Sequence, residues 1–312
     1  MFATIYPLSL SPAYDISLWV DQLGIEKINI IEKEVHNAAG KGINVARTLH
    51  AFHIPYCALV LAGEDNREKY FSLLDQEKIR YEALFLPGAT RENYHIFIPG
   101  QLGCTLARKG FWVNQVVISQ VQSMLEKHVT ADDLVIFGGR FPLGMDRDDF
   151  LSICRTIHRL GAQVAVDSNS VDLQDLLEAS PFLIKPNLEE MRVMSRRPLN
   201  TLEEQIALLH ELNEQGIRHI LLSMDEQGLL YSSLEGAWRV QVPKVFVQST
   251  VGAGDCTLSG FLAGLRKGRS LQECACLAAA FGTASVMSEG TVPPTRENVS
   301  FVLRQTKAQQ VR

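Results

Sequence analysis

The stretch LVIFGGR, residues 134–140, joins a short apolar run to two glycines and an arginine. Four consecutive apolar residues before a turn are typical of a strand that is buried on both faces. In the segment that follows, Phe150, Ile153 and Ile157 share one helical face, and Asp146 is expected to cap that helix. A buried strand followed by a helix is the repeating unit of a parallel α/β sheet.

The same alternation continues toward the C-terminus. Further apolar runs occupy residues 164–166, 182–184 and 219–223. A long helix is expected to begin at Thr201, with Glu204 in capping-box spacing, and to end near Gly216. We therefore predict an α/β core with a mostly parallel sheet and helices on both faces.

Polar groups follow each of these runs, at the point where the strand should end. They are Gly138-Gly139-Arg140, Asp167-Ser168-Asn169, Lys185-Pro186-Asn187 and Ser223. The carboxyl ends of parallel strands converge on one crevice, which is the usual ligand site of an open α/β sheet. The sequence thus indicates where a ligand should bind.

Composition limits the possible partners. The 312 residues carry a formal net charge of -5, which gives no general attraction for nucleic acid or an anionic membrane. The six cysteines form no CxxC pair, and no apolar run approaches the ~20 residues that span a bilayer. We expect a cytoplasmic protein with one domain over 1–312, an N-terminal strand in place of a signal peptide, and fraying at the last residues, KAQQVR.

Two early regions do not fit the alternation. Residues of about 13–34 and 90–108 have the partial alternation and the Pro/Gly turns of β-hairpins. We expect them to form a small sheet, or lid, beside the core.

The stretch NAAGKGINVA, residues 37–46, leads into an apolar helical pattern. Glycines before a helix permit close approach of a ligand, and the first helical amides can hold an anion. The stretch is not a dinucleotide fingerprint, because the third glycine is missing, nor a Walker P-loop, because Lys41 is followed by Gly42. Taken alone, it fits a tight turn as well as a binding loop.

A second glycine motif, VGAGD at residues 251–255, also precedes a helical pattern. An acid such as Asp255 at a helix start ordinarily satisfies free amides. A simple cap, however, needs no Gly-x-Gly before it, whereas a loop that holds phosphate oxygens does. Beside such an anion site, Asp255 is placed to accept a proton from an attacking hydroxyl.

Asn187 and Glu190 lie three residues apart at another helix start. Locally, a helix cap is the simpler interpretation. Their oxygen atoms also suit Mg²⁺ and its waters.

These motifs, in their order and at their separations, resemble the ribokinase-like (pfkB) carbohydrate kinases. AAGKGINVA, DSNS, KPNLEEM and STVGAGD carry the resemblance, which extends from SPAYD at 11–15 to residue 286. It is closest to the branch containing 1-phosphofructokinase and tagatose-6-phosphate kinase, because Lys41 stands where fructose-6-phosphate kinases carry glycine.

The resemblance implies a ribokinase-like α/β core with a β-sheet lid, ATP with Mg²⁺, and a phosphorylated ketohexose as acceptor. The exposed face and edges of such a lid favour pairing with a second copy, so we expect a homodimer. Asp255 would be the base, and the amides of Gly252, Ala253 and Gly254 would stabilise the transferring phosphoryl group. The acceptor would contact Asp15, Lys27, Gly40, Lys41, Asn44, Arg91 and Arg140. The nucleotide would contact Lys185, Asn187, Ser223, Gly228 and Gly254, and Asn187 and Glu190 would serve Mg²⁺ through water.

Four positions depart from the family pattern. Ser11 replaces an asparagine and leaves Asp15 in place. Arg140 replaces a serine, His95 replaces a lysine, and Asp225 replaces a glycine near the nucleotide. We expect Arg140 to bind phosphate in place of the lysine that His95 replaces, because the arginine fork matches phosphate oxygens. These departures also leave a second interpretation open, in which the protein binds a sugar phosphate as a sensor and has no catalytic activity. The retained Asp255 disfavours it, because a protein that only binds needs no base. Fructose 1-phosphate is the expected acceptor, with tagatose 6-phosphate as the alternative.

Overall fold

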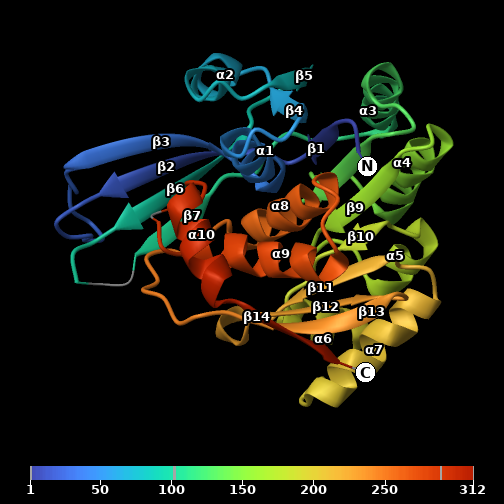
Figure 1. Cartoon of the computed structure of the whole chain (residues 1–312). Helices are drawn as coiled ribbons and strands as arrows, with labels where there is room; N and C mark the ends of the chain where they lie inside the picture. Colours follow the sequence, from blue (N-terminus) through green and yellow to red (C-terminus); the bar gives the residue numbers. More distant parts are fainter. Residues whose placement is uncertain (1, 101–102, 289, 312) are drawn as a thin grey trace.

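The computed structural model describes residues 2–100, 103–288 and 290–311, and it is built on a sheet of ten strands. The strand order is β14-β13-β12-β11-β10-β9-β8-β1-β4-β5. From β11 to β5 every neighbouring pair is parallel, whereas the β11–β12, β12–β13 and β13–β14 pairs are antiparallel. The predicted α/β class with a mostly parallel sheet is therefore confirmed (Figure 1).

The strands of this sheet are short and largely buried. They are β1 (Ile5–Ser9), β4 (Ala58–Gly63), β5 (Tyr81–Leu86), β8 (Leu134–Gly138), β9 (Gln163–Asp167), β10 (Leu183–Ile184), β11 (His219–Ser223), β12 (Leu229–Ser233), β13 (Gly236–Gln241) and β14 (Lys307–Val311). The polar groups that follow β8, β9, β10 and β11 consequently lie together at the carboxyl ends of these parallel strands, as expected.

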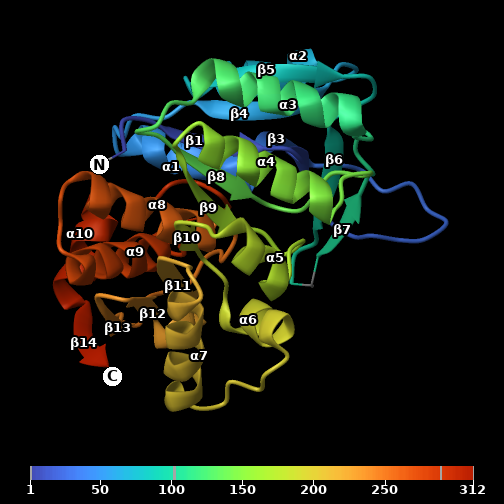
Figure 2. The ribbon, with the colours of Figure 1, turned by 90° about the vertical axis from the view of Figure 1, so that its right-hand side faces the viewer.

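Helices cover both faces of the sheet. On one face, apolar side chains of α3 (Gln115–His128), α4 (Arg147–Arg159), α5 (Leu173–Ala179), α6 (Leu188–Ser195) and α7 (Leu202–Glu214) form one core, and Figure 2 looks onto these helices. On the other, α1 (Lys41–Ala51), α2 (Arg67–Gln76), α8 (Ala253–Arg266) and α9 (Leu271–Ser285) form a second core, with α10 (Arg296–Gln305) packed outside α9. Both faces are covered by apolar side chains, which explains the continuous apolar strands.

The predicted helix starts at Asp146 and Thr201 are confirmed, and each forms a capping box. The expected fraying of the last residues is wrong. Residues 307–311 form β14, in which Gln310 pairs with Trp238 of β13. Main-chain hydrogen bonds to an open sheet edge hold this polar segment, so no apolar pattern was needed to form it.

The lid is a separate four-stranded sheet in the order β3-β2-β6-β7. Its strands are β2 (Ala13–Trp19), β3 (Lys33–Ala39), β6 (Arg91–Phe97) and β7 (Cys104–Ala107). It projects from the core at the left of Figure 1. β3 extends beyond the expected bound at residue 34, because the small residues up to Ala39 still pair with β2 and lead directly into α1.

Candidate active site

Asp255 lies in the first turn of α8, and its side chain is buried. Its Oδ2 accepts a hydrogen bond of 2.9 Å from Nδ2 of Asn44, in the first turn of α1. The N-cap of α8 is Gly252, which makes no side-chain capping bond, and no described backbone amide donates to the Asp255 carboxylate. The acid therefore faces a neighbouring helix and does not cap its own.

The surroundings of Asp255 suit a group that exchanges protons. Burial raises the pKa of Asp255 to about 6, and the nearby charge of Asp167 acts in the same direction. Lys41, the hydrogen bond from Asn44, and Lys185 oppose this rise. A carboxyl group with a pKa near neutrality can both take and release a proton, as general bases do.

Asp167, at the end of β9, holds two lysines together. Its Oδ1 accepts a hydrogen bond of 2.8 Å from Lys41 Nζ and lies 3.6 Å from Lys185 Nζ. Burial would raise the pKa of Asp167, but Lys185 and Lys41 together lower it below its usual value. The sequence placed Asp167 among the polar groups at the strand ends but gave no indication that it pairs with lysines. Only the folded chain shows that two lysines far apart in sequence share it.

Glycine is required at positions 252 and 254, before Asp255, for different structural reasons. Gly252 has φ +82°, a conformation that glycine adopts without strain. A Cβ on Gly254 would lie 2.8 Å from Lys185 Nζ, so glycine allows the ammonium group to approach the helix start. The amide of Ala253 donates to Thr250 O at 3.3 Å, whereas the amides of Gly252 and Gly254 have no acceptor within the described residues.

Gly40, Lys41 and Asn44 form the junction between the lid and the core. Gly40 is the N-cap of α1 and directly follows the lid strand β3. Lys41 and Asn44 point to Asp167 and Asp255 respectively. This predicted glycine motif is thus next to the second one, although more than 200 residues separate them.

The lid contributes a second group of polar side chains. Asn93 Nδ2 donates a hydrogen bond of 2.7 Å to Asp15 Oδ1, and His95 Nε2 lies 3.5 Å from Asp15 Oδ2. His95 Nδ1 lies 3.0 Å from Thr105 Oγ1. Two neighbours on β6 therefore hold the Asp15 carboxylate in place.

Arg91 has few hydrogen-bond partners for a half-buried guanidinium group. It donates at 3.4 Å to Asn93 Oδ1 and at 3.5 Å to Ser11 O, and its buried Nε has no partner in the described part of the chain. Burial lowers the pKa of Arg91, Asp15 opposes that effect, and the positive charge of Arg140 adds to it. Two arginines close enough to repel each other form a suitable site for an anion.

Asn187 and Glu190 form a capping box at the start of α6. Asn187 Oδ1 accepts a hydrogen bond of 2.8 Å from the Glu190 amide, and Glu190 Oε2 accepts one of 2.8 Å from the Asn187 amide. The second carboxylate oxygen of Glu190 accepts none within the described residues. One available carboxylate oxygen suits Mg²⁺, which usually keeps waters and substrate phosphates as its other ligands.

The remaining residues expected on the nucleotide side lie beside this box. Ser223 forms a backbone bridge with Asn187, and its Oγ donates to Pro186 O at 3.4 Å. Gly228 closes the turn before β12, and Asp225 within that turn has φ +47°. The departure at Asp225 therefore places a charged side chain where a left-handed backbone favours glycine.

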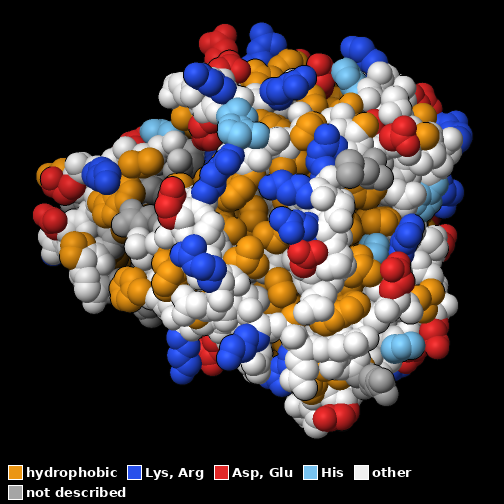
Figure 3. Space-filling view, in the orientation of Figure 1, with side chains coloured by type: hydrophobic (Ala, Val, Ile, Leu, Met, Phe, Trp, Pro, Cys, Tyr) orange, Lys and Arg blue, Asp and Glu red, His pale blue; other side chains and the backbone are white. Residues whose placement is uncertain are grey.

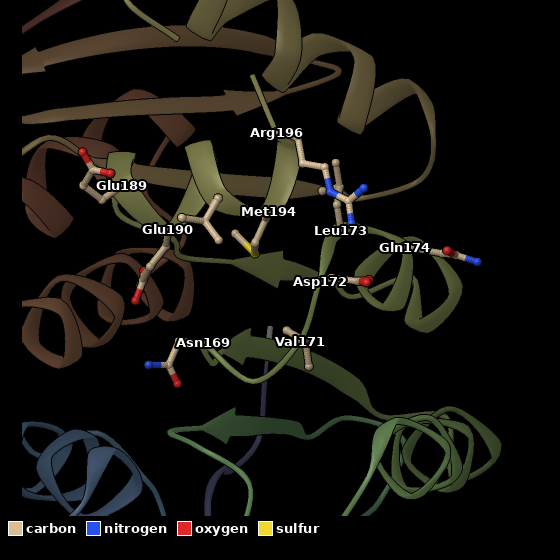
Figure 4. Close-up of a pocket in the computed structure, with 10 residues that line it drawn as sticks. Asn169, Val171, Asp172, Leu173, Gln174, Glu189, Glu190, Met194 and Arg196 are labelled. Carbon is tan, nitrogen blue, oxygen red and sulfur yellow. The ribbon is translucent and has the colours of Figure 1, made fainter. Parts of the chain in front are cut away.

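A cavity of about 800 Å³ opens next to the box, between α5 and α6. In Figure 4, Asn169 and Glu190 lie at one end of it, and Asp172, Gln174 and Arg196 lie at the other. It shares Glu190 with the site, but Asp255 does not line it. This open space therefore adjoins the capping box, and Asp255 lies outside its lining.

Within the described residues, no side-chain hydrogen bond or ion pair joins Lys27 to the other residues expected at the site. Lys27 is exposed in the loop between β2 and β3, and this loop lies at the free end of the lid (Figure 1). Four isoleucines of the same loop are also exposed: Ile25, Ile28, Ile30 and Ile31. Figure 3 shows apolar side chains on this projection next to charged ones.

The chain has the features of the ribokinase-like class. They are a ten-stranded, mostly parallel sheet, a separate lid sheet, and a buried carboxylate behind glycines at a helix start. A family model described as pfkB family carbohydrate kinase matches residues 11–298. The chain belongs to the pfkB family of carbohydrate kinases and is accordingly an ATP-dependent sugar kinase.

Known proteins are similar over nearly the whole length. The chain is 30% identical to a 1-phosphofructokinase of Bacillus subtilis (strain 168), over 91% of this chain and 93% of that protein. It is 26% identical to a tagatose-6-phosphate kinase of Staphylococcus epidermidis, over 92% and 93% respectively. The crystal structure of phosphofructokinase-2 from Escherichia coli in complex with substrates and products superposes with a TM-score of 0.88, at 24% identity and over 97% and 99% of the two chains.

These comparisons confirm the resemblance seen in the sequence motifs and the expected fold class. In the described part of the chain, no helix is long and apolar enough to cross a membrane. No cluster of three or more His, Cys, Asp or Glu side chains in that part is arranged to hold a metal on its own.

Proposed function

We propose that this kinase phosphorylates a ketohexose phosphate, and that fructose 1-phosphate is the acceptor and fructose 1,6-bisphosphate the product. The observation that carries the proposal is the buried Asp255, whose pKa lies near 6 and whose carboxylate faces the junction of lid and core. Similar proteins named 1-phosphofructokinase support this acceptor, with the Bacillus subtilis protein at 30% identity.

In the proposed reaction, Asp255 accepts the proton of the C6 hydroxyl group. The hydroxyl oxygen forms a bond to the γ-phosphorus of ATP, and the bond from that phosphorus to the β,γ-bridging oxygen breaks, which releases ADP. Positioning and charge stabilisation dominate catalysis of such transfers. The amides of Gly252, Ala253 and Gly254, with Lys185 beside Gly254, supply positive potential at the transferring group.

The acceptor is proposed to lie between lid and core. Asp15, Gly40, Lys41 and Asn44 would bind its hydroxyl groups. Its phosphate would bind the sparsely paired guanidinium of Arg91. Arg140, whose charge acts on Arg91, would complete the phosphate site.

The nucleotide is proposed to lie on the other side of Asp255. It would contact Lys185, Asn187, Ser223, Gly228 and Gly254. Most of these residues lie together at the carboxyl ends of β10 and β11 and at the start of α8. Glu190, with Asn187, would orient Mg²⁺ through water. The ion's chemistry here is to neutralise charge on the phosphates.

We further propose that two copies pair through their lids. The exposed isoleucines of the loop between β2 and β3 support such an interface, since apolar side chains gathered on a projecting surface usually mark a contact. Pairing would also bring Lys27 close to a second copy. Sedimentation of the protein, compared with a variant that carries Ile25→Glu and Ile28→Glu, tests this proposal: a monomeric wild type contradicts it.

A coupled assay of ADP release with fructose 1-phosphate, tagatose 6-phosphate and fructose 6-phosphate tests the acceptor. We expect the highest kcat/KM with fructose 1-phosphate, and a kcat at least about 10³-fold lower in Asp255→Asn. Tagatose 6-phosphate is the second candidate, supported by the Staphylococcus epidermidis relative. Tight binding of the sugars without turnover would contradict the proposed reaction.

A further inference from the structure

Arg47 is a buried arginine on α1 that the proposed reaction does not use. It lies one helical turn after Asn44, and only 9% of its surface is exposed. Its Nη1 donates a hydrogen bond of 3.2 Å to Asn44 Oδ1. Arg47 was not among the residues expected at the site, although the i, i+3 spacing from Asn44 places both on one helical face.

This contact fixes the orientation of the Asn44 amide. A guanidinium group only donates hydrogen bonds, so the Asn44 atom that faces Arg47 must be the carbonyl oxygen. The other end of the amide, Nδ2, is then directed at Asp255 Oδ2, to which it donates at 2.9 Å. If the amide turned over, its oxygen would face the carboxylate, and two acceptors would be in contact.

Other contacts hold the guanidinium group in place. Glu77 accepts hydrogen bonds from Arg47 Nε at 2.5 Å and from Nη2 at 2.9 Å, which compensates the buried charge. Arg47 Nη2 also donates to Ala38 O of the lid strand β3 at 2.8 Å, and Nη1 lies 3.5 Å from Thr291 Oγ1. The Arg47 side chain therefore contacts three separate parts of the chain. These are Glu77 at the end of α2, the lid strand β3, and Thr291 beside Gly252.

We propose that Arg47 is a positioning residue that acts through Asn44: it keeps the Asn44 amide donating to Asp255 and so keeps Asp255 ready to act as the base. This inference rests on the proposed role of Asp255. The other charged groups that face Asp255 are Asp167, Lys41 and Lys185, and none of them contacts Arg47 in the described part of the chain.

The direct test is an NMR titration of the Asp255 carboxyl carbon, assigned by comparison with Asp255→Asn. Arg47→Lys keeps the positive charge but cannot hold Asn44, Glu77 and Ala38 with one fork. We expect the Asp255 pKa in Arg47→Lys to rise by about one unit, because one hydrogen bond to a charged group is weakened. Arg47→Met should shift it in the same direction.

Glu77→Gln is the matched control, because it weakens the ion pair and leaves the Arg47–Asn44 contact in place. It should lower the melting temperature and leave the Asp255 pKa within about 0.3 units of wild type. An unchanged pKa in Arg47→Lys, or an equal shift in Glu77→Gln, overturns the proposal. This titration needs no turnover, so its outcome is separate from that of the acceptor assay.

A double-mutant cycle tests the route through Asn44. If Arg47 acts only through Asn44, the change from Arg47 to Lys should lower kcat about tenfold in wild type and have almost no effect in an Asn44→Ala background. The acceptor is whichever sugar phosphate the coupled assay shows to be turned over. Equal decreases in both backgrounds contradict action through Asn44, while absence of all turnover in wild type contradicts the proposed function instead.

Discussion

Asn44 Nδ2 lies 2.9 Å from Asp255 Oδ2, which joins the first turn of α1 to the first turn of α8. The two residues are 211 positions apart, and each follows a glycine-containing turn. This contact brings both glycine motifs to one carboxylate. The site therefore depends on the packing of α1 against α8 and on neither motif alone.

Replacing Asp255 should separate catalysis from folding. Asp255→Asn keeps the size of the side chain but removes the base, so we expect kcat to fall by at least about 10³-fold with little change in acceptor KM. Kinetics and circular dichroism of the two proteins check this expectation. A variant that unfolds yet keeps its activity per folded molecule would favour a structural role for Asp255.

The pKa of Asp255 predicts opposite effects of pH on activity and stability. Activity requires the ionised form, so kcat/KM should fall as the pH drops through about 6. The folded-state pKa is above the value of about 4 in an unfolded chain, so the folded protein binds the proton more tightly. The resulting stabilisation is complete below about pH 4 and disappears as the pH rises through about 6.

Asp255→Asn lacks this ionisation and should gain stability relative to wild type between about pH 6 and 8. The gain should be on the order of 1–3 kcal/mol. Urea unfolding of both proteins at about pH 5 and about pH 8 measures it. The control is Asp148→Asn, at an exposed position of α4. The difference in free energy of unfolding between this variant and wild type should be the same at both pH values. If the difference in free energy of unfolding between Asp255→Asn and wild type is the same at both pH values, the pKa of Asp255 is not raised.

Much of this fold was predictable because its strands are buried on both faces and its helices carry explicit caps. LVIF and the capping box at Thr201 are local signals, and each specifies its element without tertiary context. β14 was not predictable in this way, because its polar residues are held by main-chain bonds to β13. Its stability comes from a partner strand and not from its own pattern.

The site also combines residues that the sequence indicates with residues that it does not. The glycine motifs around Gly40 and Gly254 are visible in the sequence, since close backbone approach demands that residue type. Asp167 and Arg47 are ordinary charged residues by composition. Their roles come from distances to Lys41, Lys185 and Asn44 that only the folded chain sets.

Arg140 should affect the acceptor and not the nucleotide. Its charge acts on Arg91, whose Nε has no partner within the described residues. Arg140→Ala should therefore raise the acceptor KM about tenfold and leave the ATP KM within about twofold. Steady-state kinetics with each substrate varied in turn test this. The matched control is Arg108→Ala, because Arg108 is exposed and paired with Glu92 on the lid. An unchanged acceptor KM in Arg140→Ala excludes a phosphate contact.

Asp225 should lower both stability and nucleotide affinity. Its φ of +47° is a left-handed conformation that strains a residue with a Cβ, so Asp225→Gly should stabilise the protein by about 1 kcal/mol. It also removes a negative charge from the turn before Gly228, and the KM for ATP should therefore fall severalfold. Glu226→Gln, one residue along the same exposed turn, removes an equal charge without changing the backbone preference. If the two variants lower the ATP KM equally, the effect is one of general charge, and Asp225 has no special position beside the nucleotide.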